Sequence, residues 1–300
     1  MTSEIAALSE PRHQPVLCAE VLEYLKPEAG QTLVDATVGS GGHAALLVER
    51  LGPRGRLIAL DQDATMLDVA RRRLADRPIT WVHANFRQLR TVLTELGVGQ
   101  VDGVLAVLGV CSDQLDDPKR GLSFQQPGPL DMRLDPEGAT TAAELLRTWS
   151  ERDLADLFWK YGEERFSRRI ARKIVETRRQ TPLETTTQLA DLICRCVPRP
   201  AGRRHGIHPA TRVFQALRIA VNDEMAALEE FLRDLPECLR PRGRAVVISF
   251  HSLEDRRVKQ AFRQRSQWVV LTPKPVQPTE EEVCRNPRAR SAKLRAAMRN

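Results

Sequence analysis

The sequence predicts an α/β protein whose parallel sheet is interrupted by an inserted all-α domain. Between residues 32 and 108, four apolar stretches with the composition of buried strands alternate with stretches of helical periodicity. A glycine-rich turn, TVGSGG, directly follows the first of these strands. From residue 114 to 208 there are several helical periodicities and no convincing strand. We therefore expect a discontinuous core, residues 1–113 and 209–300, and an inserted helical domain, residues 114–208.

Composition and charge exclude several classes of protein. The 300 residues are 42% hydrophobic and 28% charged, which is typical of neither disordered nor membrane-embedded chains. No apolar run approaches the roughly 18 residues of a membrane span, and the first residues lack a signal-peptide pattern, so we expect a cytoplasmic location. Six scattered cysteines without a CxxC pair predict neither a disulfide framework nor a metal site. The net charge of +7 favours a polyanionic partner.

The segment from residue 13 to 63 predicts a cofactor cradle. Apolar residues at helical spacing predict a packing helix that closes at Pro27 and Gly30, before a strand at 32–36. The glycines of the following turn let the backbone approach a ligand closely, and the next helix offers free N–H groups. GSGGHA alone would equally suit a nicotinamide enzyme or a tight structural turn. The next strand, 57–61, ends in Asp61, where an acidic side chain typically binds the ribose hydroxyls; the alternative for Asp61 is a helix cap.

Two further strands complete the nucleotide-binding half. A helix at 64–75 leads to a strand at 79–85, after which Phe86 can cover an adenine ring or simply belong to the core. A helix at 86–96 then leads to a strand at 101–108. The small, polar elbow after this strand, at 109–113, is where we expect the chemistry, because ligands bind at the carboxyl ends of strands in open α/β sheets.

The inserted domain carries a basic face. We expect helices at 142–149, from 151 onward, at 163–179 and at 185–197, preceded by a turn-rich stretch too long for an ordinary connection. The third of these helices places its positive charges largely on one side, through Arg165, Arg168, Arg169, Arg172 and Lys173. A second basic stretch, PRPAGRRHGIHP, follows at 198–209. A solvated charged face is the alternative, but two patches beside a cofactor cradle favour binding of a nucleic-acid backbone.

The last ninety or so residues return to the core. A long amphipathic helix at 209–235 leads to a strand at 243–250, which ends at His251 and Ser252. A histidine after a strand can act as a base or cap the next helix. Residues 273–287 predict a proline-rich loop, and the basic end beyond it can supply a last strand while contacting RNA through Arg288 and Arg290.

Taken together, these segments resemble the RsmH family, formerly MraW, of 16S rRNA (cytosine-N4) methyltransferases. The resemblance covers nearly the whole chain. It rests on long motifs: DATVGSGGHA, VDGVLAVLGVCSDQLDDPKRGLSF followed by GPLDMR, YGEERFSRRIARKIV, HPATRVFQALRIAVNDE, ISFHSLEDR and NPRARSAKLR. These motifs are far more specific than the glycine turn alone.

The resemblance implies a class I S-adenosylmethionine-dependent methyltransferase fold, which is Rossmann-like, with a helical substrate domain inserted. It implies S-adenosylmethionine as cofactor, and methylation of a cytosine amino group in the decoding region of 16S rRNA. The implied partner is the small ribosomal subunit, bound by a monomer or homodimer. The family contacts the cofactor at the positions of Gly41, Gly42, His43, Asp61, Phe86 and Gln114. The target base, single-stranded or flipped, would stack on an aromatic side chain such as Phe124.

The elbow departs from the family pattern. The family's motif is DLGVSS, whereas this chain has VLGVCS, so Val107 stands where an aspartate is normal and Cys111 where a serine is normal. Asp113 replaces the usual proline. Candidates to accept a proton from the amine are therefore Ser112 and Asp113, and the catalytic group is left unassigned. Three hypotheses stay open: a methyltransferase, a silent rRNA-binding assembly factor of the same fold, and a nicotinamide-dependent oxidoreductase.

Overall fold

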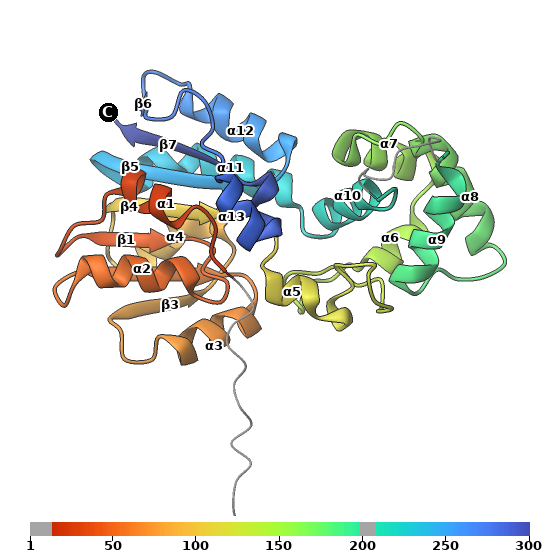
Figure 1. Ribbon diagram of the computed structural model, residues 1–300, viewed down its shortest axis with the longest axis horizontal. Helices are drawn as coiled ribbons and strands as arrows, with labels where there is room; N and C mark the ends of the chain where they lie inside the picture. The colour runs from red at the N-terminus through yellow and green to blue at the C-terminus, as the bar shows by residue number, and fades with distance from the viewer. Residues whose placement is uncertain (1–13, 199–207) are drawn as a thin grey trace, which may run out of the picture. The chain divides into compact units, whose positions relative to one another are not determined.

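The computed structural model describes residues 14–198 and 208–300, which form two compact units. The first unit takes the chain as far as Asp113 and again from Ala227, and the second runs from Gln114 to Ala226. The first unit is a sheet covered by helices, and the second consists mainly of helices (Figure 1). Among the described residues, no helix is long and apolar enough to cross a membrane.

A seven-stranded sheet forms the centre of the first unit, with the order β3-β2-β1-β4-β5-β7-β6. Its strands are β1 (Thr32–Asp35), β2 (Arg56–Asp61), β3 (Ile79–His83), β4 (Val101–Val107), β5 (Leu239–Ser249), β6 (Trp268–Val270) and β7 (Lys293–Arg299). β7 is antiparallel to both of its neighbours, and the remaining neighbouring pairs are parallel. The chain order reverses between β1 and β4, which is where open α/β sheets bind their ligands.

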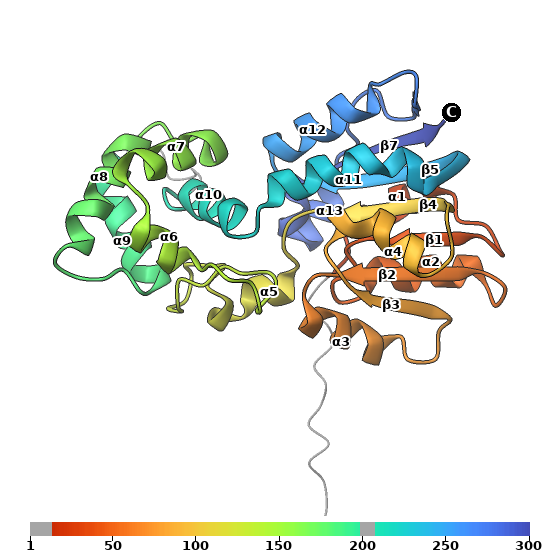
Figure 2. The ribbon, with the colours of Figure 1, turned by 180° about the vertical axis from the view of Figure 1, so that it is seen from behind.

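Successive residues of a strand point to opposite faces of the sheet, so that Leu33 and Val34 belong to different apolar clusters. The cluster of Val34 packs against α4 (Leu89–Glu95), α11 (Glu224–Cys238) and α12 (Ser252–Phe262) (Figure 2). The cluster of Leu33 packs against α1 (Cys18–Leu25), α2 (Gly42–Leu51) and α3 (Ala64–Arg73). Burial on both faces explains why these strands are continuous apolar runs in the sequence.

The sequence predicted most elements of this unit. The strands expected at 32–36, 57–61, 79–85, 101–108 and 243–250 are confirmed, and the basic C-terminal stretch supplies β7. The three-residue strand β6 was missed. The loop expected at 273–287 is wrong in part, because α13 (Glu280–Arg285) forms there. Thr279 caps this helix by accepting the Glu282 N–H (3.2 Å), and acidic residues in the first turn complement the helix dipole.

The second unit contains the helices expected in the insertion, with one changed boundary. They are α6 (Ala142–Thr148), α7 (Glu151–Gly162), α8 (Ser167–Arg178) and α9 (Thr186–Cys196). The helix expected from residue 163 begins instead at Ser167. Glu163 ends α7 in the left-handed region (φ 50°), and the buried Glu164 carboxylate accepts the Phe166 N–H (2.8 Å), which forms a turn between the two helices.

The single helix expected at 209–235 is wrong. It is broken into α10 (Thr211–Val221), which belongs to the second unit, and α11, because Asp223 adopts a left-handed conformation (φ 48°). The Asn222 side chain accepts the Leu134 N–H (2.7 Å) and donates to the Met132 carbonyl (2.8 Å). The second unit therefore extends to Ala226, whereas the sequence analysis returned the chain to the core at residue 209.

Replacing Asn222 is expected to destabilise the second unit. Asn222→Ala leaves the Leu134 N–H and the Met132 carbonyl without their partner, which costs about 2 kcal/mol of unfolding free energy. Urea unfolding, followed by circular dichroism, measures the loss. Gln215→Ala on α10 is the matched control, because Gln215 donates one hydrogen bond, to the Tyr161 carbonyl (3.0 Å). Equal losses in the two variants would contradict the assignment.

Candidate active site

A glycine turn joins β1 to α2 at the switch point of the sheet. Gly41 is the N-cap of α2 and is left-handed (φ 84°), and none of the described side chains caps the free N–H groups of this helix. A Cβ on Gly41 would lie 3.2 Å from the Leu74 side chain and 3.3 Å from that of Ala70, and one on Gly42 would lie 3.0 Å from Pro15. The turn therefore needs glycine for both conformation and space, and it presents backbone N–H groups to a ligand.

Asp61 fastens this turn to the end of β2. One carboxylate oxygen accepts the Gly39 N–H (2.8 Å), and the other accepts the Asp63 N–H (2.9 Å). Burial raises the pKa of Asp61 to about 6, against the lowering effect of these two N–H groups. The residue proposed for the ribose hydroxyls thus also holds the glycine turn in place. Asp61 is not the helix cap that the alternative interpretation assigned to it, because the N-cap of α3 is Asp63.

A second buried carboxylate, that of Asp35, ends β1 directly before the turn. It is 1% exposed and accepts the Thr37 N–H (3.2 Å). Burial raises the pKa of Asp35 to about 7, and the neighbouring charge of Asp61 contributes in the same direction. The sequence analysis did not single out Asp35. Its signal was available: a lone acidic residue that ends an apolar strand immediately before a glycine-rich turn.

The end of β3, just before Phe86, is hydrogen-bonded to the end of β2 at Asp61. The Ala84 N–H donates to the Asp61 carbonyl (3.0 Å), so β2 and β3 end together. Phe86 begins the short helix η1 (Phe86–Gln88), and its half-buried ring contacts Phe231 edge-on at 5.4 Å. Both readings of Phe86 are thus compatible with its position, since it packs on the core and lies at the ligand-binding edge.

His43 connects the glycine turn to the segment before α1. Its buried side chain has Nε2 2.8 Å from the Val16 carbonyl oxygen. Two residues near the C-terminus hold the same segment. The Leu17 N–H donates to Glu282 Oε1 (2.7 Å), and the Asn286 side chain donates to the Gln14 carbonyl (3.1 Å). His43 therefore positions residues 14–17 against the start of α2.

The elbow after β4 lies beside the glycine turn. A Cβ on Gly39 would be 3.7 Å from that of Cys111, and Cys111 Sγ lies 3.4 Å from Met66 Sδ. The Val107 N–H donates to Thr37 Oγ1 (2.6 Å), which connects the elbow with the residue bonded to Asp35. Val107 itself offers no polar side-chain atom at this strand end.

Ser112, Asp113 and Gln114 lie in the short helix α5 (Ser112–Asp116). Ser112 and Gln114 are buried, and Gln114 is the first residue of the second unit. Oδ2 of Asp113 is enclosed and has no hydrogen-bond partner among the described residues, and the same holds for the hydroxyl of Ser40 in the glycine turn. Two enclosed polar atoms thus remain for a ligand, one in each of the loops that the sequence singled out.

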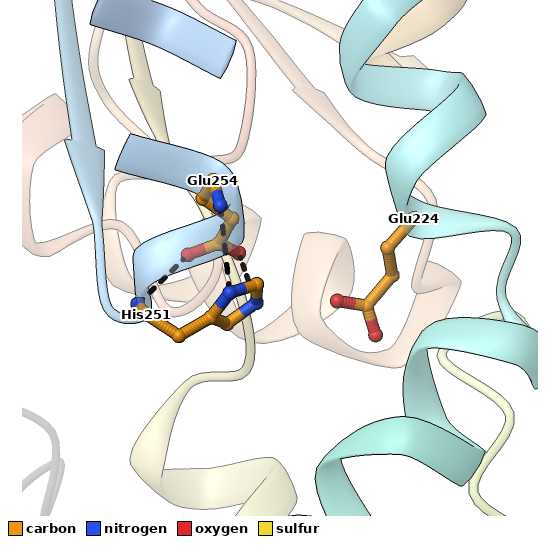
Figure 3. A group of neighbouring side chains, drawn as sticks. All are labelled: Glu224, His251 and Glu254. Atoms are coloured by element: carbon orange, nitrogen blue, oxygen red, sulfur yellow. Dashed lines mark hydrogen bonds and ion pairs between the residues drawn. The ribbon is translucent and has the colours of Figure 1, made fainter. Parts of the chain in front are cut away.

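His251 caps α12. The Phe250 N–H donates to Glu254 Oε2 (2.8 Å). The His251 N–H donates to the same oxygen (3.3 Å), and His251 Nε2 lies 3.2 Å from Glu254 Oε1 (Figure 3). The Glu254 N–H is 3.5 Å from His251 Nδ1, which completes a reciprocal capping box. Of the two roles left open for His251, the geometry supports helix capping.

The expected RNA-binding residues lie on the surface of the unit to which each belongs. Arg168, Arg169 and Arg172 are exposed on α8, and the exposed Arg165 precedes this helix rather than lying on it. Arg172 pairs with Glu151 (3.5 Å). Arg288 and Arg290 are exposed on η3 (Pro287–Ser291) of the first unit. Most of the second basic stretch, residues 199–207, lies outside the described residues.

The ring of Phe124, which the sequence analysis expected to stack on the target base, already contacts two other rings. Its ring stacks on His208, with centroids 4.6 Å apart and planes at 27°, and it meets Phe214 edge-on at 4.9 Å. The His208 ring thus covers one face of Phe124.

With this geometry in place, comparison with known proteins decides the family. The model of the MraW methylase family matches residues 10–300. The chain belongs to the MraW methylase family. It is 48% identical to "Ribosomal RNA small subunit methyltransferase H" of Thermomicrobium roseum, over 98% of this chain and 96% of that protein. The protein of the same name from a Synechococcus species is 51% identical, over 96% of this chain and 92% of that protein.

Among solved structures, an rRNA methylase from Streptococcus thermophilus matches 94% of this MraW methylase and 93% of that chain, at 10% identity and a TM-score of 0.43. A likeness this distant adds nothing to the assignment. Family membership makes the chain a methyltransferase and excludes the nicotinamide-dependent alternative.

S-adenosylmethionine is the cofactor of this MraW methylase, as expected from the sequence. The residues present fit it. The glycine turn offers N–H groups and the orphaned Ser40 hydroxyl, and two buried carboxylates, Asp35 and Asp61, flank the turn. A cationic sulfonium with a ribose suits this acidic edge, because a positive charge favours the ionised form of a carboxylate with a raised pKa.

Proposed function

We propose that this chain methylates the N4 amine of a cytidine in the decoding region of 16S rRNA within the small ribosomal subunit. The observation that carries the proposal is the identity of 48% and 51%, along nearly the whole chain, with proteins named small-subunit rRNA methyltransferases. The cytoplasm, where ribosomal subunits are found, is the compartment that this proposal implies.

The reaction requires positioning more than acid–base strength. An exocyclic cytosine amine is a poor nucleophile, since its lone pair is delocalised into the ring. S-adenosylmethionine supplies an electrophilic methyl group when bound. The chain has to hold the amine in line with that group and to offer an oxygen that accepts the amine N–H.

We assign the acceptor role to Asp113. With Val107 at the end of β4, the strand itself contributes no carboxylate to the elbow. Asp113, in the first turn of α5, has an enclosed oxygen without a partner among the described residues, which is what an acceptor awaiting a substrate N–H requires. Ser112 is the weaker candidate, because a neutral hydroxyl accepts a less strong hydrogen bond than a carboxylate does.

The cofactor and RNA contacts follow from the same proposal. We propose that Gly41, Gly42, Asp61 and Phe86 bind S-adenosylmethionine directly, with His43 positioning the turn and Gln114 contributing from α5. The exposed arginines of α8, with Arg165, Arg288 and Arg290, bind RNA phosphates. The face of the Phe124 ring opposite His208 stacks on a base.

Methyl transfer by the unaltered chain is the expected result. Incubation with methyl-labelled S-adenosylmethionine and unmethylated small subunits should place label on N4 of cytidine, as identified by nucleoside mass spectrometry. Asp113→Asn, which keeps the shape and removes the charge, should lower kcat by about 10²-fold with little change in cofactor affinity. If Asp113→Asn transfers methyl groups as fast as the unaltered chain, the acceptor assignment is wrong.

The second candidate, a silent assembly factor, is favoured only by Val107. It predicts binding to small subunits without transfer, and transfer restored in Val107→Asp. Label incorporation only with Val107→Asp would replace the proposed function by this one.

A further inference from the structure

A hollow with basic walls lies in the first unit, away from the loops described above. It is formed between the second half of α12 and the segment that begins with β6. Four of its lining side chains are cationic, from Lys259, Arg263, Arg265 and Arg295. The rest of the lining includes the rings of Phe262 and Pro273, and no acidic residue.

The four cations are not equivalent. The Arg295 guanidinium is buried and bonded to both oxygens of Asp255 (2.6 and 3.2 Å), so this charge is neutralised within the fold. No ion pair involves Lys259, Arg263 or Arg265 among the described residues. Three cations around one hollow are thus left without an acidic partner, whereas the nearby Arg257 on the same helix pairs with Glu229 (2.7 Å).

The apolar part of the hollow distinguishes it from an ordinary solvated basic surface. Phe262 is 2% exposed and forms part of its wall, and Val270, on the edge strand β6, is 37% exposed. An apolar surface rimmed by cations matches a nucleotide, in which a sugar or base is flanked by phosphates. A protein partner would more commonly require acidic side chains or a larger apolar area.

The hollow is separate from the cofactor turn. β6 is the edge strand, and β4, β5 and β7 lie between it and β1, which carries the turn. Four strand spacings correspond to about 19 Å. A ligand at the hollow therefore does not occupy the cofactor position.

We infer that Lys259, Arg263 and Arg265 form an RNA phosphate-binding site on the first unit, which contacts the substrate outside the methylated nucleotide. The inference rests on the proposed function, because it takes RNA to be the substrate. Such a site adds affinity and fixes the orientation of the RNA without contributing to the chemical step.

The test compares two triple variants with the same change in charge. Lys259→Gln, Arg263→Gln and Arg265→Gln together remove the site. Arg54→Gln, Arg72→Gln and Arg77→Gln form the control, since these arginines are exposed near the opposite edge of the sheet. Filter binding measures the Kd for unmethylated small ribosomal subunits at salt concentrations from about 0.05 to about 0.3 M, a range that includes physiological ionic strength. Calorimetry measures the Kd for S-adenosylmethionine.

We expect the first triple variant to bind subunits at least about tenfold more weakly at 0.15 M salt, and its plot of log K against log salt to be shallower by about two. Its affinity for S-adenosylmethionine stays unchanged. The control should lose less than about threefold in subunit affinity, as expected for a general loss of positive charge.

Equal losses in the two triple variants would overturn the inference, as would unchanged subunit binding by the first. Failure of the proposed function has a different signature: the unaltered chain would transfer no methyl group to the subunits, whatever the two triple variants bind. If the first variant loses affinity equally for subunits and for an acidic protein, the site is not specific to RNA and the inference is wrong.

Discussion

Asp61→Ala is expected to weaken binding of S-adenosylmethionine by about 10²-fold. The substitution removes the acceptor of the Gly39 and Asp63 N–H groups, so the glycine turn loses its side-chain connection to the end of β2. Two hydrogen bonds to a charged carboxylate account for about 2 to 4 kcal/mol, and every 1.4 kcal/mol or so corresponds to about tenfold in affinity. Isothermal titration calorimetry with S-adenosylmethionine measures the change.

Asp68→Ala is the matched control for this experiment. Asp68 lies on α3, has a side chain that is 66% exposed, and pairs with Arg71 at 3.7 Å. The control should bind the cofactor like the unaltered chain. Unchanged binding by Asp61→Ala would show that neither the turn nor the ribose contact depends on this carboxylate, and circular dichroism verifies that the variant is folded.

Asp35→Asn is expected to make the cofactor-free protein more stable at pH 8 but not at pH 4. The folded pKa of Asp35 is raised from 3.8 to about 7, so the folded chain binds a proton that the unfolded chain has already released. Stability attributable to this group is therefore complete below pH 4 and is lost as pH rises towards about 7. Asparagine does not ionise and avoids the loss.

The expected gain at pH 8 is on the order of 2 to 4 kcal/mol, since one pKa unit corresponds to about 1.4 kcal/mol. Urea unfolding at pH 4, 6 and 8 measures it, with Asp68→Asn as the exposed control. The same substitution should weaken S-adenosylmethionine binding, because the acidic edge loses a charge. A stability difference that does not change with pH would contradict the raised pKa of Asp35.

Local patterns in the sequence identified the parallel strands, the glycine turn and Asp61. They could do so because burial on both faces leaves continuous apolar runs, and because a turn before a helix requires glycine at fixed positions. Asp35 was missed although its place at the end of an apolar strand was visible, because the burial that raises its pKa comes from strands on both sides of β1. The charge of Asp61, on the neighbouring strand, adds a smaller effect in the same direction.

Features created by distant residues could not be predicted in this way. The break between α10 and α11 depends on hydrogen bonds from Asn222 to residues 132–134, which are about ninety positions earlier. Helical periodicity continues through the break, since both helices keep an apolar face. The basic hollow likewise combines α12, β6 and β7, and its cations Lys259, Arg263 and Arg265 lie outside the motifs that carry the family resemblance.

The contacts that hold residues 14–17 limit how far the chain can be shortened. Glu282 and Asn286, close to the C-terminal strand, hold this segment, which in turn meets His43 and Gly42 at the start of the cofactor turn. Deleting α13 would release residues 14–17, and the glycine turn would lose its contact with Pro15. A proteolytic cut near residue 280 should thus impair cofactor binding, although it falls far from β1 and α2 in the sequence.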